Sequence, residues 1–159
     1  ERYSVLAVTS VYGVDILADN VAECRTRLFT LWDKDYKSVC KKSTNDEARE
    51  AVKYILSKNV LCGNALTLMC VDENQEDTDT PIIFPEWSLM LGTKLKRRDF
   101  RLDVMLKAND KPPNKQLSLL DVPEDIRKYL SINPATKEYM AEPICEYPPA
   151  HYRKVQENG

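Results

Sequence analysis

The clearest hydrophobic pattern in the chain is a helical stripe between residues 44 and 59. Thr44 precedes Glu47 by three residues, which is the spacing of a helix N-terminal capping box. The apolar positions that follow recur every three or four residues, as on the buried face of an amphipathic helix. They are Ala48, Ala51, Val52, Ile55 and Leu56. The pattern predicts a helix that ends at Asn59, because asparagine tolerates the left-handed backbone of a helix end.

Similar signals predict three further helices. Asn20 stands three residues before Glu23, and apolar residues at helical spacing follow, which predicts a helix over about 20–32. Pro123 is followed by two acidic residues, the pattern of a helix start, and predicts a short helix over 123–131. Another short helix is predicted over 134–140.

Other segments have the composition or the alternation of strands. Residues 3–11 are rich in β-branched and aromatic types, which predicts a hairpin or a bent strand. Residues 64–71 are apolar at nearly every position, as in a central strand covered on both faces. Apolar and charged residues alternate over 99–107, which predicts a half-buried strand with a charged outer face. A short edge strand is predicted over 36–40.

Together these elements predict an α+β fold, a single compact domain with a mixed or antiparallel sheet flanked by helices. With 159 residues, of which 43% are hydrophobic, the chain can build one sizeable core. We expect this domain to span residues 1–142. Residues 109–114 have the composition of a loop, and residues 143–159, rich in proline, are expected to be an extended tail or linker.

Cysteine usage and charge narrow the classes of protein. The five cysteines have neither disulfide-framework nor zinc-ligand spacing, and His151 is the single histidine. We therefore expect a reducing, intracellular location, cytoplasmic or nuclear, with no cofactor and no metal. No apolar run is long enough to cross a bilayer, so we expect no membrane partner. Because the chain starts at Glu1 rather than at a methionine, we expect it to be part of a larger protein.

Two charged segments of opposite sign are the main candidates for recognition. Residues 72–79 are acidic and are expected to form an exposed loop, whereas residues 94–101 are basic. The basic side chains could contact a partner protein or a phosphate backbone, and tail aromatics could anchor a partner. These candidate binding residues are Lys94, Lys96, Arg97, Arg98, Arg101, Tyr147 and Tyr152. An ordinary solvated strand face would carry the same charges, and the tail could equally seal the core of its own domain.

One weak pattern points to catalysis. Asp35, Tyr36 and Lys37 form an acid-x-lysine triplet downstream of Asp15, and Mg²⁺-dependent nucleases use carboxylates and a lysine in this way. The triplet arises easily by chance in a chain that is 30% charged. The sequence therefore favours a non-enzymatic protein-interaction domain of a regulatory or scaffold protein. A nucleic-acid-binding domain is the first alternative and a Mg²⁺-dependent nuclease is the second.

Overall fold

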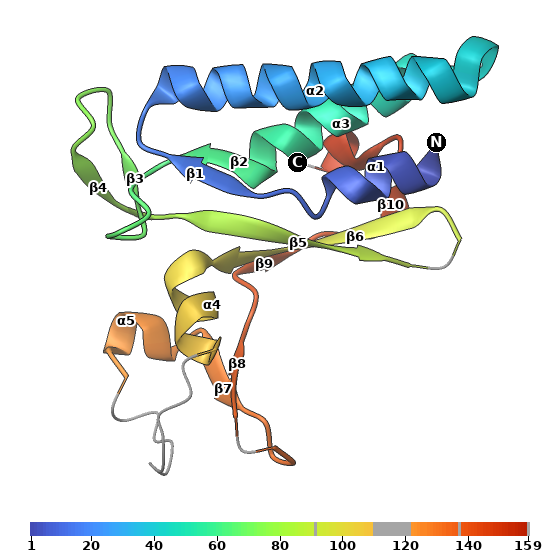
Figure 1. Cartoon of the computed structure of the whole chain (residues 1–159). Helices are drawn as coiled ribbons and strands as arrows, with labels where there is room; N and C mark the ends of the chain where they lie inside the picture. The colour runs from blue at the N-terminus through green and yellow to red at the C-terminus, as the bar shows by residue number, and fades with distance from the viewer. Residues whose placement is uncertain (91, 110–121, 137, 159) are drawn as a thin grey trace.

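The computed structural model describes residues 1–90, 92–109, 122–136 and 138–158, and it has the predicted α+β fold. Figure 1 shows a main body, in which helices lie over a β-sheet, and a smaller extension below it. The predicted loop at 109–114 lies outside the described residues except for Asn109.

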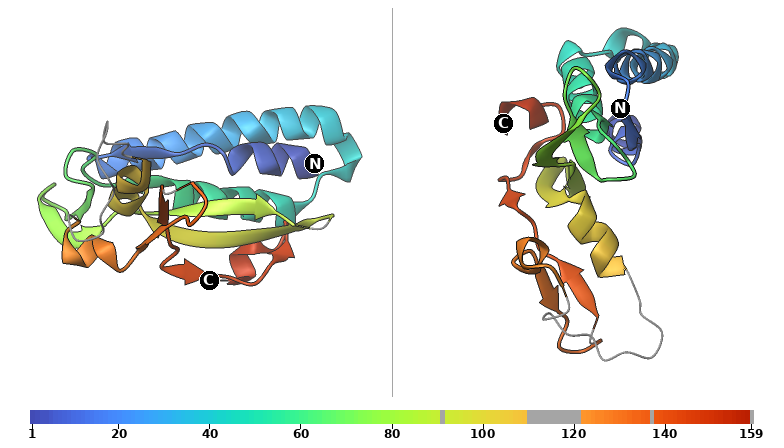
Figure 2. Two further views of the ribbon diagram at one scale, coloured as in Figure 1. Left: turned by 90° about the horizontal axis from the view of Figure 1, so that it is seen from below. Right: turned by 90° about the vertical axis from the view of Figure 1, so that its left-hand side faces the viewer.

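The helical layer of the main body comes from the first part of the chain. Its elements are α1 (Arg2–Val8), α2 (Ala18–Cys40), the 3-10 turn η1 (Lys41–Ser43) and α3 (Asp46–Asn59). Two short strands, β1 (Gly13–Asp15) and β2 (Val60–Cys62), pair in parallel beside these helices. Both Figure 1 and Figure 2 show α1 running alongside the longer α2.

The sheet under these helices is antiparallel and is centred on β6. Its strands are β5 (Ile83–Leu89), β6 (Lys94–Arg101), β9 (Cys145–Glu146) and β10 (Ala150–His151). β5 pairs with one edge of β6, while β9 and β10 pair with the other edge. The C-terminal residues therefore complete the sheet, and the short turn η3 (Val155–Asn158) follows them. A separate hairpin consists of β3 (Met69–Val71) and β4 (Asp77–Pro81).

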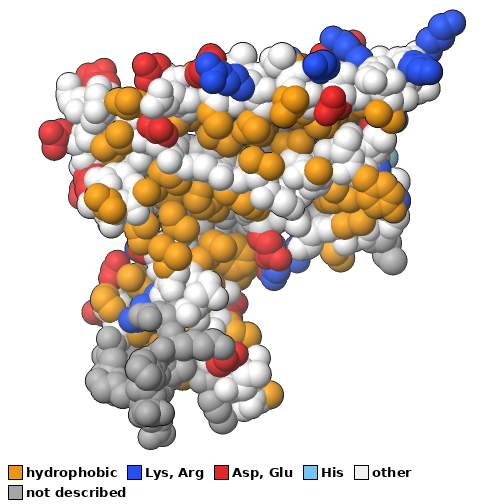
Figure 3. Space-filling model, in the orientation of Figure 1, with side chains coloured by type: hydrophobic (Ala, Val, Ile, Leu, Met, Phe, Trp, Pro, Cys, Tyr) orange, Lys and Arg blue, Asp and Glu red, His pale blue; other side chains and the backbone are white. Residues whose placement is uncertain are grey.

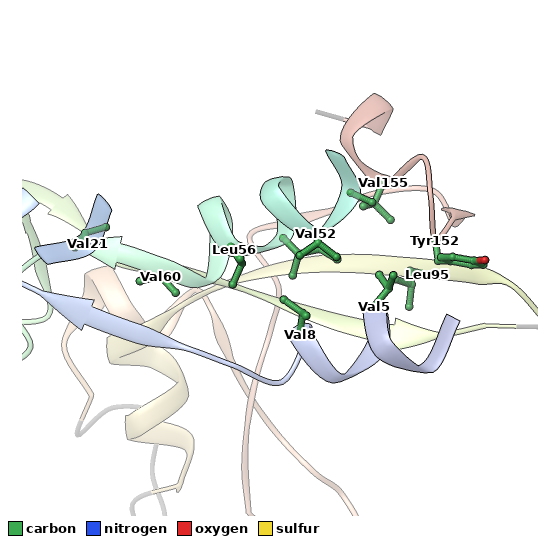
Figure 4. Close-up of a cluster of buried hydrophobic side chains, with 11 residues drawn as sticks. Val5, Val8, Val21, Val52, Leu56, Val60, Leu95, Tyr152 and Val155 are labelled. Carbon is green, nitrogen blue, oxygen red and sulfur yellow. The ribbon is translucent and has the colours of Figure 1, made fainter. Parts of the chain in front are cut away.

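The main core lies between the helical layer and the sheet (Figure 4). Val5 on α1 and Val52 on α3 are fully buried, and Leu95 contributes from β6. Tyr152 and Val155 from the C-terminal segment are only 6% and 4% exposed. Residues from both ends of the chain thus close the same core.

The extension has a small core of its own. It is formed by α4 (Leu102–Asn109), α5 (Glu124–Arg127), β7 (Leu130–Ile132) and β8 (Tyr139–Ala141). Val104, Val122, Leu130 and Tyr139 are buried together there. The helix predicted over 123–131 is shortened to α5, because Leu130 begins β7. The helix predicted over 134–140 is wrong, since Tyr139 begins β8 and pairs with Ile132.

The helical stripe over 44–59 is confirmed as α3, with all five predicted apolar residues buried. The side chain of Asn45, rather than that of Thr44, caps the helix by accepting the Ala48 N–H at 3.3 Å. Asn59 does not adopt a left-handed conformation. It stays helical and fully buried, and its amide donates to the backbone oxygens of Val8 and Thr9.

The strand predicted over 3–11 is wrong, because residues 2–8 form α1. Val5 and Val8 are three residues apart and lie on one face of this helix, where both are buried. Their burial outweighs the preference of β-branched residues for strands. The helix predicted over 20–32 is part of the longer α2, which also includes the predicted edge strand at 36–40. Tyr36 is buried there and stacks on Trp32 with ring centroids 4.6 Å apart.

Two other strand predictions fail over part of their length. In the segment 64–71 the side chain of Leu66 is 94% exposed, and only residues 69–71 form a strand. The Asn64 side chain accepts the Leu66 N–H at 3.0 Å, so a local turn replaces the predicted central strand. In the segment 99–107 the strand ends at Arg101 and continues as α4. Leu106, predicted to face the core, is 51% exposed on that helix.

Within the described residues, no helix combines the length and the apolar character that a membrane span requires.

Candidate interaction surfaces

The basic strand β6 has two faces with different surroundings. Side chains alternate between the two sides of a strand, so Leu95, Arg97 and Asp99 share one side. Leu95 belongs to the main core, and Arg97 bonds to Tyr54 of α3, which shows that this side faces the helices. Lys94, Lys96 and Arg98 lie on the opposite side. The sequence had predicted that Asp99 and Arg101 would lie on an outer charged face, and Asp99 is instead buried.

Arg97 is held in the interior by a close set of partners. Its guanidinium donates to both carboxylate oxygens of Asp99, at 2.7 and 2.6 Å, and to the Tyr54 hydroxyl at 2.5 Å. The ring of Tyr147 lies 4.3 Å from it in a cation–π contact. Burial would lower the pKa of Arg97, but its hydrogen bonds and the negative charge of Asp99 raise that pKa above its usual value. Arg97 is therefore a charged interior residue, only 9% exposed.

The other bases of the segment are paired with nearby acids. Lys96 lies 2.5 Å from Glu146, and Arg98 lies 2.5 Å from Glu86. Arg101 pairs with Asp103 at 2.6 Å and with Asp125 at 3.3 Å. In the described part of the chain, none of these pairs involves the acidic segment 72–79. Of the five predicted basic residues, Lys94 alone is exposed without an ion pair among the described residues.

The two predicted tail aromatics contact other parts of the same chain. Besides stacking on Arg97, Tyr147 donates its backbone N–H to the Arg97 oxygen at 2.9 Å. The Tyr152 ring is buried in the main core, and its hydroxyl donates to Glu1 at 2.5 Å. Burial, and then the hydrogen bond to Glu1, raise the pKa of Tyr152.

The three residues of the nuclease hypothesis are not brought together. Asp15 precedes α2 and accepts the Leu17 N–H at 2.8 Å. Asp35 lies 17 residues beyond the first residue of α2, which corresponds to about 25 Å along the helix axis. Lys37 pairs with Asp33 at 2.6 Å. Among the described residues there is no cluster of three potential metal ligands.

A groove between α1 and α2 is a surface that the sequence analysis missed. It encloses about 340 Å³, and its apolar lining includes Ala7, Val8, Val11, Trp32 and Val39. Figure 3 shows hydrophobic side chains forming a band below α2 on this face of the molecule. The spacing of apolar residues along α2 could have indicated an apolar helix face here. That face was not predicted, because residues 36–40 were predicted to form a strand. The α1 wall of the groove was not predicted either, because residues 3–11 were predicted to form a strand.

Val39, which lines the groove, is strongly exposed, and so are two apolar side chains near it. Val39 on α2 is 79% exposed, and Leu31, two turns earlier on the same helix, is 60% exposed. Tyr3 on α1 is 71% exposed. Both helices therefore present apolar side chains to solvent along the groove.

One end of the groove is polar. The Glu1 carboxylate accepts hydrogen bonds from Tyr36 and Tyr152, and from Arg153 at 2.5 Å. Burial would raise the pKa of Glu1, but these hydrogen bonds lower it below its ordinary value. Burial and the bond to Glu1 raise the pKa of Tyr36 to about 12. The Glu1 carboxylate is thus occupied by hydrogen bonds from the same chain. Of the two carboxylates that line the groove, Asp35 is the exposed one.

No family model, no curated protein and no solved structure matches this chain.

Proposed function

We propose that the chain is a protein-interaction domain and that the groove between α1 and α2 receives a segment of the partner protein. The observation that carries this proposal is a largely apolar groove that contains the exposed side chain of Val39, with Leu31 and Tyr3 exposed one helical turn from its lining residues Asp35 and Ala7. Contiguous exposed apolar patches on folded proteins mark interaction sites, because covering them removes apolar surface from water. Docking a protein segment there would gain free energy in proportion to the apolar area covered, at about 25 cal/mol per Å².

The lining of the groove favours a protein segment over a nucleic acid. Its walls are mainly apolar, and its charged lining residues, Glu1 and Asp35, are acidic. A phosphate backbone would be repelled by these carboxylates, whereas apolar side chains of a protein would be desolvated by the walls.

A site-specific cross-linking experiment tests the proposal. A photoreactive amino acid replaces Val39, the chain is expressed in cells, and covalent adducts are detected after irradiation. We expect an adduct with another protein that Leu31→Glu removes, because a charge beside the groove would have to be desolvated on docking. The matched control is Leu66→Glu, which changes another exposed leucine on the loop between β2 and β3. An adduct that survives Leu31→Glu, or is lost equally in Leu66→Glu, would contradict docking in the groove.

Nucleic-acid binding, the first alternative from the sequence, has less support from the geometry. Lys94, Lys96 and Arg98 lie on the side of β6 that faces away from the helices, which we call its open face. Lys96 and Arg98 are paired there with Glu146 and Glu86, so the local excess of positive charge is small. Anisotropy titration with single-stranded and duplex RNA and DNA at two salt concentrations tests this alternative. Steeply salt-dependent binding that Lys94→Gln and Lys96→Gln weaken would support it. Arg97→Ala is unsuitable for this test, because Arg97 is an interior residue.

A further inference from the structure

The groove has helical walls on both sides, and each wall exposes residues at the spacing of successive turns. On α2 the exposed lining residues are Asp35 and Val39, four residues apart, and Leu31 is exposed one turn before Asp35, at the margin of the wall. On the other side, Ala7 of α1 lines the groove and is exposed, and Tyr3 is exposed one turn before it, at the margin of the wall. The α2 ridge from Leu31 to Val39 extends about 12 Å along its axis. That length matches about two turns of a third helix.

Among the described residues, the groove lining contains no residue of a β-strand, so it offers no sheet edge to an extended peptide. In α1 and α2 the backbone N–H and C=O groups are bonded within the helices, except at the helix ends. Strand addition needs a row of unpaired backbone groups along a sheet edge. A segment that binds here must instead form its backbone hydrogen bonds within itself, as an α-helix does.

The charge pattern on α2 defines the occupant further. Asp33 is neutralised by Lys37 at 2.6 Å and by Arg49 at 2.8 Å. Asp35 is exposed between Leu31 and Val39, and it has no ion-pair partner among the described residues. A cationic side chain on the occupant would pair with it when apolar side chains fill the groove.

We infer that the groove takes an amphipathic helix of the partner protein whose apolar face carries a lysine or arginine at its margin, opposite Asp35. This inference rests on the proposed function and names the kind of partner that the groove fits. The apolar residues of such a helix recur at positions i, i+3 or i+4, and i+7. The ion pair with Asp35 sets the direction and register of the helix more than its affinity.

A second copy of this chain fits the groove less well. In a two-fold symmetric dimer the same surface contacts itself, so both Asp35 carboxylates would lie at one interface. Each carboxylate would then need a cation from the other copy, and the described residues lining the groove include no lysine or arginine. The charge pattern therefore points to a different protein.

Selection from a random peptide library displayed on phage tests the inference. The whole chain is the bait, and clones that also bind the Val39→Glu variant are removed, which leaves binders that depend on the groove. We expect the remaining peptides to carry apolar residues at helical spacing together with a lysine or arginine. A proline in the middle of such a peptide should abolish binding, because it breaks the helix.

Charge reversal then tests the role of Asp35. We expect Asp35→Lys to weaken the selected peptides by about fivefold or more, and a lysine-to-glutamate change in the peptide to restore binding to this variant. Glu73→Lys, an exposed charge reversal on the β3–β4 hairpin, is the matched control and should change affinity little.

Several outcomes would overturn the inference. They are an absence of groove-dependent clones, clones that tolerate the proline, clones indifferent to Asp35→Lys, or self-association of the chain that Val39→Glu abolishes. These results are distinguishable from failure of the proposed function. If cross-linking at Val39 captures a protein while the selected peptides lack helical spacing, the groove docks a protein but not a helix. If Leu31→Glu leaves the cross-linked adducts unchanged, the proposed function itself fails.

Discussion

Arg97 and Arg98 are neighbours in the chain, yet they lie in opposite environments. Arg97 faces the helices, where its side chain is 10% exposed and bonded to Asp99 and Tyr54. Arg98 faces away from them, with its side chain 35% exposed and paired with Glu86 at 2.5 Å. Two arginines that are adjacent in one basic segment therefore have different structural roles. One is part of the interior, whereas the other is a surface charge.

The largest difference between the two arginines should appear when each is replaced by methionine. Arg97→Met leaves Asp99 as a buried carboxylate without its bidentate partner, which typically costs about 3–5 kcal/mol. Urea denaturation followed by tryptophan fluorescence measures the free energy of unfolding. A loss below about 1 kcal/mol would show that Asp99 has enough access to water to be solvated.

The double variant Arg97→Met, Asp99→Leu sharpens this result. Replacing both members of a buried ion pair by apolar residues often restores stability, because no charge remains to be desolvated. We expect it to recover most of the loss caused by Arg97→Met. If it is no more stable than the single variant, packing of the Arg97 side chain rather than its charge explains the loss.

On the side of the sheet that faces the helices, the buried Asn59 links α3 to α1 and β5 by hydrogen bonds. Its side-chain oxygen accepts the Trp87 indole N–H at 2.9 Å, and its amide donates to the Thr9 oxygen at 3.2 Å. Asn59→Ala would leave these buried groups unpaired and should destabilise the fold by about 2–3 kcal/mol. The measurement is again urea denaturation, with Asn158→Ala near the C-terminus as a control for a surface amide. Equal effects of the two changes would contradict the role given to Asn59.

Helices were predictable from the sequence where the buried residues recur at the three- or four-residue spacing of a helix. The α3 stripe was predicted correctly because all five of its apolar residues are buried and four of them, Ala51, Val52, Ile55 and Leu56, pack in the main core. The strand prediction for α1 failed because Val5 and Val8 are residue types that favour strands. Their burial against other elements, which the local sequence does not show, stabilises a helix instead. The alternation at 99–107 crosses the junction of β6 and α4, and no local signal marks that junction.

The candidate site was much less predictable. The basic run was visible in the sequence, but the positions of Glu86 and Glu146, which neutralise it, depend on strand register. The groove between α1 and α2 arises only when two helices lie side by side, and one of them was predicted as a strand. The exposure of Leu31 could not be inferred from its spacing, because apolar residues at positions 31 and 32 both fit the helical pattern of α2 and only Trp32 packs against the core.

A smaller effect is expected from Glu1, which ties the two ends of the main body together. Its pKa is lowered in the folded state, because hydrogen bonds from Tyr152, Tyr36 and Arg153 outweigh the effect of burial. The carboxylate therefore stabilises the fold above its ordinary pKa of 4.5, and this contribution is lost as the pH falls through the lowered value. At pH 7 we expect Glu1→Gln to cost about 1–2 kcal/mol.

Denaturation of the wild-type chain and of Glu1→Gln at several pH values isolates this contribution. The difference in unfolding free energy between the two should be constant near neutral pH and should shrink in acid. Other carboxylates also titrate in acid, but they are common to both chains and cancel in the difference. A difference that stays constant down to pH 3 would show that the Glu1 charge contributes nothing.

The smallest effect should come from Arg98→Met on the open face of β6. The Arg98–Glu86 pair is partly solvated, and exposed pairs of this kind contribute about 0.5 kcal/mol. Added salt should reduce this small difference further, because ions screen exposed charges. Lys96→Met, which removes the partner of Glu146, is the matched control on the same face. If Arg98→Met proved as costly as Arg97→Met, the open face of β6 would be as integral to the fold as the buried one, and the contrast between the two arginines would be wrong.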